Sequence, residues 1–267
     1  MRRTLIAAAL LSLAACGTAM PDTITAAGVA RENPAQAPVE ETVRGLTAFG
    51  DRLYQASADP AKNVVLSPLS IGYAFGMARA GASPQTGTEL DRLFGFPAQG
   101  PHTAFNRLTR QIVTIEGPPP APATEPESGE ERKPKPPIVG IANGLFVQQG
   151  FAVKEPFLRT LAAQYGVGVH PVDFGGDAAD VINKWAEEQT AGRIKHVLDK
   201  APSDTKAAIT NALYLKAEWK HTFEDGAKQA AFTRADGSVV RADLMQLREP
   251  LRYASGPGWQ AVELPYA

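Results

Sequence analysis

The 267-residue sequence predicts an α+β fold, because helical patterns crowd its first half and strand patterns its second half. In the first half, Ser-Pro pairs open apolar runs of helical period and glycines close them. In the second half, runs that alternate apolar and polar residues are separated by Asp-Gly and Gly-Pro-Gly turns. The composition, 44% hydrophobic and 21% charged, is that of an ordinary globular protein.

Helices are expected throughout the part of the chain before residue 117. The first begins near Val39, where apolar residues start to recur at helical spacing. The second has Ser67 as its N-cap, Pro68 at its first helical position and Gly81 beyond its end. Its central stretch, LSIGYAFGMA, has no polar face, which predicts a helix buried on all sides. Two more helices are expected over residues 84–94 and around residues 105–112.

Strands and helices alternate over the next part of the chain, and strands follow to its end. A strand over IVGIANGLFVQQG precedes a helix that runs from Pro156 to Gly166, and a strand over VGVHPVDF precedes the helix in DAADVINKWAEEQTAGRI. A long strand is expected over residues 207–219. The strands after it are predicted to turn at Asp236-Gly237 and at Gly256-Pro257-Gly258.

The N-terminus has the features of a secretory signal. Arg2 and Arg3 precede an apolar run that is too short to span a bilayer, which takes about 20 residues. The small residues of LAAC resemble the bacterial lipobox, so we predict a lipoprotein signal peptide over residues 1–15 and lipidation at Cys16. This predicts a protein that is extracellular or at the cell surface, lipid-anchored to the bacterial membrane. The alternative is an ordinary signal peptide with an incidental cysteine.

Two further segments carry no pattern of a packed core. Residues 16–38 are small and polar with prolines, which predicts a flexible tether between the membrane and the domain. Residues 117–137 are rich in proline and charge, which predicts a solvated insertion that acts as a spacer. The folded domain is therefore expected to span residues 39–267.

Composition and motifs argue against several classes of function. The net charge of -1 argues against a nucleic-acid partner, and the single cysteine excludes an internal disulfide and a cysteine-based metal cluster. The sequence contains no G-x-S-x-G, H-E-x-x-H, P-loop or G-x-G-x-x-G motif. Its four histidines have no metal-ligand spacing: His102, His170, His196 and His221. We expect no cofactor, no metal and no enzymatic activity, although a Ser-His-Asp constellation assembled in space would leave no motif.

Several stretches in sequence order resemble the serpin family. NVVLSPLSI resembles the start of the family's helix B, and INKWAEEQTAGRIKHVL resembles helix F and the segment after it. TNALYLKAEWKHTFE resembles strand 3 of the large sheet A and its exit, and VELPY falls in the family's order after it. The resemblance runs from about Val39 to Ala267 and is interrupted at residues 117–137. It implies the serpin fold, in which helices pack on large mixed or antiparallel β-sheets.

Four residues take candidate roles from this resemblance. Ser67 and Ser70 match two serines under sheet A, and Asn211 matches the strand 3 asparagine that faces them. In serpins these groups belong to the shutter, a hydrogen-bonded switch that controls whether sheet A can open. Without the resemblance, Ser67 is an N-cap and Ser70 a polar residue of the first turn. Trp219 matches the tryptophan of the breach, where loop insertion begins, and its alternative interpretation is a core aromatic residue.

The resemblance implies a suicide inhibitor of a serine or cysteine endopeptidase. The target protease attacks an exposed reactive loop, and the cleaved loop then inserts into sheet A as a new strand. The alternatives are a non-inhibitory binding or scaffold protein and an inactive truncated fragment. Small residues at the hinge of the loop would favour insertion, whereas bulky or charged residues or proline would oppose it.

The sequence ends shortly after VELPY, where serpins continue. The family's strand 5 of sheet A, hinge, reactive loop, shutter histidine and last strands all follow this point. We therefore expect an incomplete serpin fold in which the reactive loop and the last strands are missing. Residues 39–267 expressed alone are expected to aggregate or to remain molten, because strand 207–219 would be a long apolar edge.

Overall fold

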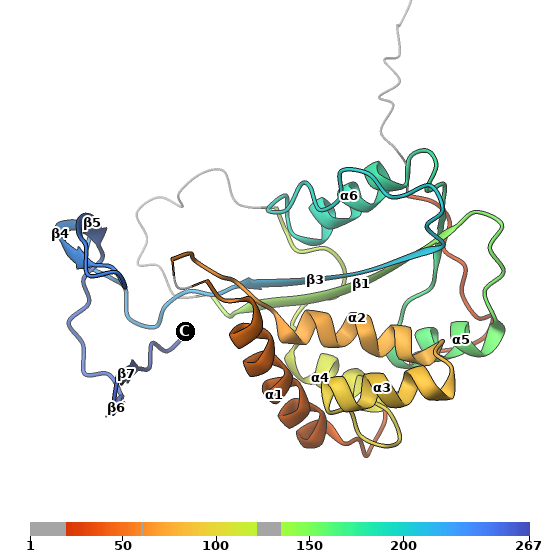
Figure 1. Ribbon diagram of the computed structural model, residues 1–267, viewed down its shortest axis with the longest axis horizontal. Coiled ribbons are helices and arrows are strands. Elements are labelled where there is room, and N and C mark those ends of the chain that lie inside the picture. Colours follow the sequence, from red (N-terminus) through yellow and green to blue (C-terminus); the bar gives the residue numbers. More distant parts are fainter. Residues whose placement is uncertain (1–19, 60, 122–134) are drawn as a thin grey trace, which may run out of the picture.

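The computed structural model describes residues 20–59, 61–121 and 135–267 and confirms the α+β class. The signal peptide, Cys16 and residues 122–134 of the insertion lie outside the described residues. Helices precede most of the strands along the chain (Figure 1). The elements are α1 (Val39–Ser57), α2 (Pro68–Ala80), α3 (Pro84–Phe94), α4 (His102–Ile112), β1 (Ile138–Gln148), α5 (Glu155–Thr160) with the π-helix η1 (Leu161–Tyr165), β2 (His170–Val172), α6 (Ala178–Gln189), β3 (Ala207–Lys216), β4 (Lys228–Thr233), β5 (Val239–Leu244), β6 (Tyr253–Gly256) and β7 (Trp259–Val262).

A three-stranded sheet in the order β2-β1-β3 divides the body of the molecule into two layers. β1 pairs with β3 in antiparallel fashion from Ile138↔Lys216 to Val147↔Ala207, and it pairs with β2 in parallel fashion. Helices α1 to α4 lie on one side of the sheet and α6 on the other (Figure 1). The long strand expected over residues 207–219 thus ends at Lys216, three residues earlier than predicted.

The larger core lies between the sheet and helices α1 to α4, and it is rich in aromatic rings. Phe94 stacks on Phe96 at 5.1 Å between ring centroids, and Tyr73 lies 4.4 Å from Phe105. A smaller core between the sheet and α6 contains Trp185, whose ring meets Phe146 edge-on. Each large side chain buried in these cores contributes about 1.5–3 kcal/mol to stability.

Helix α2 is not buried on all sides, so that part of the sequence prediction is wrong. Tyr73 and Met77 are buried between α2 and the core, but Phe75 is 43% exposed on another side of the helix. The centroid of the Phe75 ring lies 5.0 Å from that of Phe94. An apolar pattern on every side of a helix marks each face that could be buried, and only one of these faces is covered here.

The tether predicted over residues 16–38 is also wrong for residues 20–32. Residues 20–32, here called the N-terminal strap, lie along the domain. Ile24 exchanges two backbone hydrogen bonds with Val169, of 2.8 and 2.9 Å, and Ala26 is only 6% exposed. The backbone N–H of Glu32 donates to the carbonyl of Ala163 at 2.8 Å. The strap docks because the edge of the domain offers free backbone groups for it, which no local pattern in residues 20–32 reveals.

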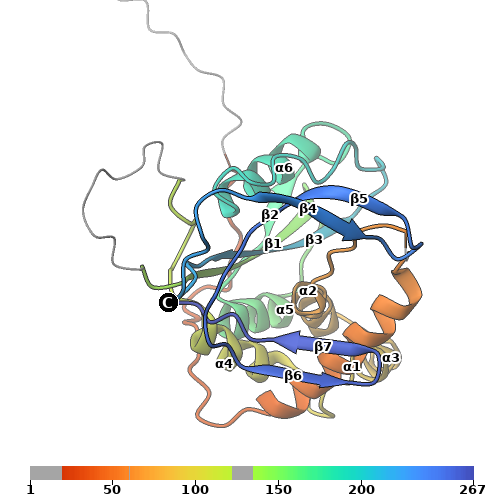
Figure 2. The same cartoon turned by 90° about the vertical axis from the view of Figure 1, so that its left-hand side faces the viewer.

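Two hairpins follow β3 and lie to one side of the helical body (Figures 1 and 2). The predicted turns are confirmed: Gly237 joins β4 to β5 with φ 81°, and Gly258 joins β6 to β7 with φ 79°. Most side chains of both hairpins are exposed, including the large apolar residues Phe232 and Trp259. The hairpins are thus folded locally but, among the described residues, have little core of their own.

A polar network crosses the helical core. Arg79 forms an ion pair with Asp91, with 2.7 Å between Nη2 and Oδ2, and Nδ1 of His102 lies 2.9 Å from the Tyr165 hydroxyl. Burial, helped by the positive charge of Arg79, lowers the pKa of His102 from 6.5 to about 4. Burial raises the pKa of Tyr165 well above 10, so the phenol keeps its proton beside His102. The folded protein therefore holds His102 neutral.

Replacing Gly45 and Gly87 separates packing from helix propensity, because both are helical glycines. A Cβ on Gly45 would lie 2.2 Å from the carbonyl oxygen of Gly95, where α1 crosses the end of α3, whereas a Cβ on Gly87 would meet nothing within 4 Å. We expect Gly45→Ala to destabilise the protein by about 1–3 kcal/mol. Gly87→Ala should stabilise it by about 0.5–1 kcal/mol. Urea unfolding would measure the change in the free energy of unfolding for both variants. Equal changes would contradict the close contact of α1 with the end of α3.

The lowered pKa of His102 predicts a loss of stability in mild acid. The unfolded chain binds a proton at His102 below pH 6.5, and the folded chain binds it only near pH 4. The free energy of unfolding therefore falls as the pH is lowered from 6.5 to 4. The loss should reach about 3 kcal/mol by pH 4. His102→Gln should flatten the decline of stability between pH 6.5 and 4 in thermal unfolding. An unchanged pH profile in this variant would rule the mechanism out.

Candidate functional site

The candidate site lies where β3 faces the start of α2. Within the described residues, β3 is an edge of its sheet: β1 occupies one side of the strand and no strand occupies the other. Side chains alternate along β3, so Ala208 and Ala212 face the α6 core. Ile209 packs into the core on the α2 side, and Asn211, two residues further on, points to the same side.

Ser67 caps helix α2 as predicted. Its Oγ accepts a hydrogen bond of 3.2 Å from the backbone N–H of Ser70, and it donates one of 2.9 Å to the Ser70 hydroxyl. Pro68 follows at the first helical position, where its missing N–H costs nothing. The two serines thus form a closed local pair at the helix start.

Asn211 bonds to the neighbouring strand rather than to either serine. Its Nδ2 donates to Oδ1 of Asn143 at 2.8 Å and to the carbonyl of Ala142 at 3.2 Å. Its own Oδ1 is buried and has no hydrogen-bond partner in the described structure. A buried acceptor without a partner costs about 1–3 kcal/mol, so this atom favours an arrangement that brings a donor to it.

Asn143 is the member of this group that the sequence analysis missed. It lies opposite Asn211 in the register of β1 and β3. An asparagine within the apolar run IVGIANGLFVQ is a signal that could have marked it, because a buried amide needs partners. Its partner could not be named from the sequence, since register is a property of two distant strands. The structure thus places the predicted shutter residues in two separate bonded pairs, Ser67 with Ser70 and Asn211 with Asn143.

Trp219 lies beyond the end of β3 and is 38% exposed, so it is not a core aromatic residue. Its ring stacks on Tyr266 at 4.7 Å with an interplanar angle of 15°, and its backbone forms an antiparallel bridge with the same residue. The neighbouring Lys220 N–H donates to the carbonyl of Pro265 at 2.9 Å. The segment around Trp219 is therefore held by the VELPY stretch, a contact that the sequence analysis did not foresee.

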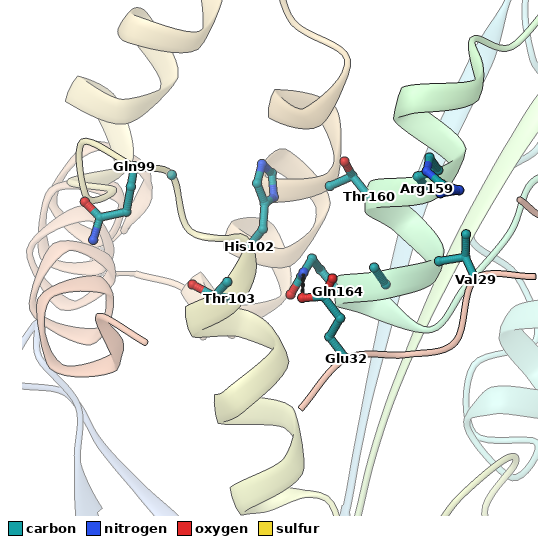
Figure 3. Close-up of a pocket in the computed structure, with 10 residues that line it drawn as sticks. Val29, Glu32, Gln99, His102, Thr103, Arg159, Thr160 and Gln164 are labelled. Atoms are coloured by element: carbon teal, nitrogen blue, oxygen red, sulfur yellow. Dashed lines mark hydrogen bonds between the residues drawn. The ribbon is translucent and has the colours of Figure 1, made fainter. Parts of the chain in front are cut away.

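A cavity of about 460 Å³ lies elsewhere, between α4, the α5–η1 helix and the N-terminal strap (Figure 3). Nε2 of Gln164 donates to a carboxylate oxygen of Glu32 at 2.7 Å across its wall. His102 lines the cavity, but its hydrogen bond is to Tyr165 rather than to Thr103 or Thr160. Among the described residues, this cavity therefore holds no hydroxyl that a histidine base activates.

The described side chains and helices also bear on metal binding and on membrane insertion. In the described part of the chain, no group of three or more His, Cys, Asp or Glu side chains lies close enough together to hold a metal ion. No helix in the described ranges is both long enough and apolar enough to cross a membrane.

The family model of serpins, described as serine protease inhibitors, matches residues 44–267. Over 84% of its length, the chain is 32% identical to an uncharacterized serpin-like protein of Thermococcus kodakarensis, of which it covers 50%. It is 30% identical to human neuroserpin over 85% of the chain and 55% of that protein. Serpin-Z1C of Triticum aestivum is 32% identical over 82% of the chain and 54% of that protein.

Solved structures of serpins share the fold. Lamprey angiotensinogen with a cleaved reaction loop superimposes with a TM-score of 0.70 at 26% identity, over 86% of this chain and 65% of that one. Cleaved Serpin 42Da gives the same TM-score at 27% identity, over 85% of this chain and 59% of that one. The chain spans about half the length of the curated relatives it matches. With most of its length matched by the family model and this fold, the chain belongs to the serpin family.

Proposed function

We propose that the protein inhibits an endopeptidase of the serine class, with the cysteine class as the alternative target, by inserting its cleaved reactive loop into the sheet beside β3. The single observation that carries this proposal is the match of residues 44–267 to the family model described as serine protease inhibitor. In this mechanism the inserted loop would pair with β3 through backbone hydrogen bonds. The description of the matched family model, serine protease inhibitor, supports the serine class.

In the proposed mechanism, the protease supplies the covalent chemistry and the inhibitor supplies the bait and a bistable sheet. The protease nucleophile attacks the carbonyl of a loop peptide bond, the bond to nitrogen breaks, and an acyl ester or thioester joins the loop to the enzyme. Insertion of the loop into the sheet then carries the acylated protease away before water reaches the ester. The native fold stores the free energy that this insertion releases. The protein itself has no catalytic role in this proposal.

The free Oδ1 of Asn211 gives the proposed shutter a physical basis. This buried acceptor has no partner among the described residues, while Nδ2 is already bound to β1. A donor on a strand beside β3 would satisfy it, and the family's shutter histidine is the group that the resemblance supplies. Ser67, Ser70 and Trp219 keep the shutter and breach roles proposed from their positions. The sheet can then exchange one satisfied network for another as it opens.

We also propose that Cys16 carries the lipid anchor and that the protein acts at the bacterial cell surface. The signal-like run before Cys16 and the small residues of LAAC support this localisation. Two or three acyl chains on one cysteine would anchor the protein stably, whereas a single chain binds only reversibly.

The test is to mix the complete purified protein with a panel of serine and cysteine endopeptidases and separate the products on denaturing gels. At least one protease should form a complex that survives SDS, and its activity should be lost with a stoichiometry near one. If every protease cleaves the protein without forming a complex, the inhibitory proposal fails and the non-inhibitory binding or scaffold role takes its place.

Ser67 and Ser83 offer a matched pair that separates capping from the shutter. Both are N-caps before a proline, and each accepts a backbone hydrogen bond of 3.2 Å. Ser67→Ala and Ser83→Ala should each lower stability by about 1 kcal/mol. Only Ser67→Ala should also raise the number of inhibitor molecules consumed per protease, because it disturbs the opening of the sheet. Equal stoichiometry for the two variants would leave Ser67 with a capping role alone.

A further inference from the structure

The N-terminal strap determines how much free chain lies between Cys16 and the folded domain. Met20 packs against the core between α6 and the sheet. Ile24 then pairs with Val169 just before β2, and Thr23 Oγ1 lies 3.3 Å from Nδ1 of His170. The start of the described chain accordingly lies beside α6 (Figure 1).

The far end of the strap is held equally firmly. The carbonyl of Glu32 accepts hydrogen bonds from Nδ2 of Asn106 at 2.9 Å and from Nη2 of Arg110 at 2.8 Å. Its carboxylate accepts from Gln164 at 2.7 Å, and Asn106 is almost completely buried. Contacts at both ends, with the buried Ala26 between them, make the strap part of the domain rather than a linker.

The docked strap shortens the distance available between the predicted anchor and the domain. Only four residue steps separate Cys16 from Met20, and an extended chain of that length reaches at most about 14 Å. A free tether from Cys16 to Val39 would reach about 80 Å. A domain of this size has a radius of gyration of about 17 Å, so the shorter reach is less than the radius of the body that it holds.

We propose that the bilayer itself is a binding partner of one defined face: the corner formed by α6, the start of β2 and the strap is held against the lipid surface. This inference rests on the lipid anchor at Cys16 proposed above. A body larger than its tether cannot swing its far side toward the anchor. The hairpins β4–β5 and β6–β7 lie at the other end of the long axis of Figure 1, and β3 runs toward them. The proposed breach at Trp219, beyond the end of β3, is then presented away from the membrane to proteases in the medium.

Two labelled variants of the complete lipidated protein test this orientation in vesicles. Cys16 is the only native cysteine, and lipidation blocks its thiol, so a new cysteine can be labelled alone. Asp22→Cys places a donor fluorophore on the exposed strap, and Ala235→Cys places it on the exposed β4–β5 turn. In phosphatidylcholine vesicles that contain an acceptor-labelled lipid, the donor at position 22 should be quenched several-fold more than the donor at position 235. Equal quenching at the two positions would overturn the proposal.

A linker variant shows whether the short reach is the cause. Twenty Gly/Ser residues inserted between Ala19 and Met20 add about 25 Å of mean end-to-end distance without touching the strap. The insertion should largely abolish the difference in quenching between the two positions. A difference that survives the insertion would mean that the surface of the domain, and not the strap, sets the orientation, and would overturn the proposal as stated.

Failure of the anchor is distinguishable from failure of the orientation. Vesicle flotation and the mass of the N-terminal peptide report the lipid on Cys16 directly, and an unmodified Cys16 would remove the anchor and this inference together. A lipidated protein with equal quenching at both positions would remove only the orientation. Complex formation with proteases in detergent depends on neither result, so it tests the inhibitory proposal separately.

Discussion

The antiparallel pairing of β1 with β3 is the interaction on which the rest of the structure depends. Its register decides which side chains face each core: Ile209 and Asn211 point to the α2 side, and Ala208 and Ala212 to the α6 side. A shift by one residue would exchange these faces and turn Thr210, in place of Asn211, toward α2. The same pairing leaves the other side of β3 open in the described structure. Helical layers, the polar pair in the core and the proposed place of insertion all follow from this one ladder.

The polar side chains between β3 and α2 differ in how completely they are hydrogen-bonded. Ser67 and Ser70 satisfy each other, so they cost little in the present arrangement. Asn211 satisfies its donor group through Asn143 and leaves its acceptor buried without a partner in the described structure. A buried acceptor of this kind favours any arrangement that brings a donor to it. The physical content of the proposed shutter is therefore a local energy cost that a neighbouring strand removes.

Local features of this fold could be predicted from the sequence, and non-local ones could not. The cap at Ser67, the Ser-Pro pair that opens α3 and the turns at Gly237 and Gly258 were correct, because each depends on a few adjacent residues. The serpin resemblance supplied the family and the position of Asn211. The partners in the strand ladder and beyond were missed, because distant segments create them: Asn143 opposite Asn211, Tyr266 on Trp219, and the strap on Val169. The prediction that α2 is buried on all sides was wrong for the same reason. An apolar face shows that a helix surface can be buried, and distant segments decide whether it is.

The sheet is proposed to accept a further strand beside β3, and one comparison tests this most directly. The complete protein would be cleaved at its reactive loop with a catalytic amount of protease, and the midpoint of thermal unfolding would be measured before and after cleavage. Insertion adds a full ladder of backbone hydrogen bonds and releases stored strain, so the account predicts a large rise in the midpoint on cleavage. A midpoint that stays the same or falls would contradict it.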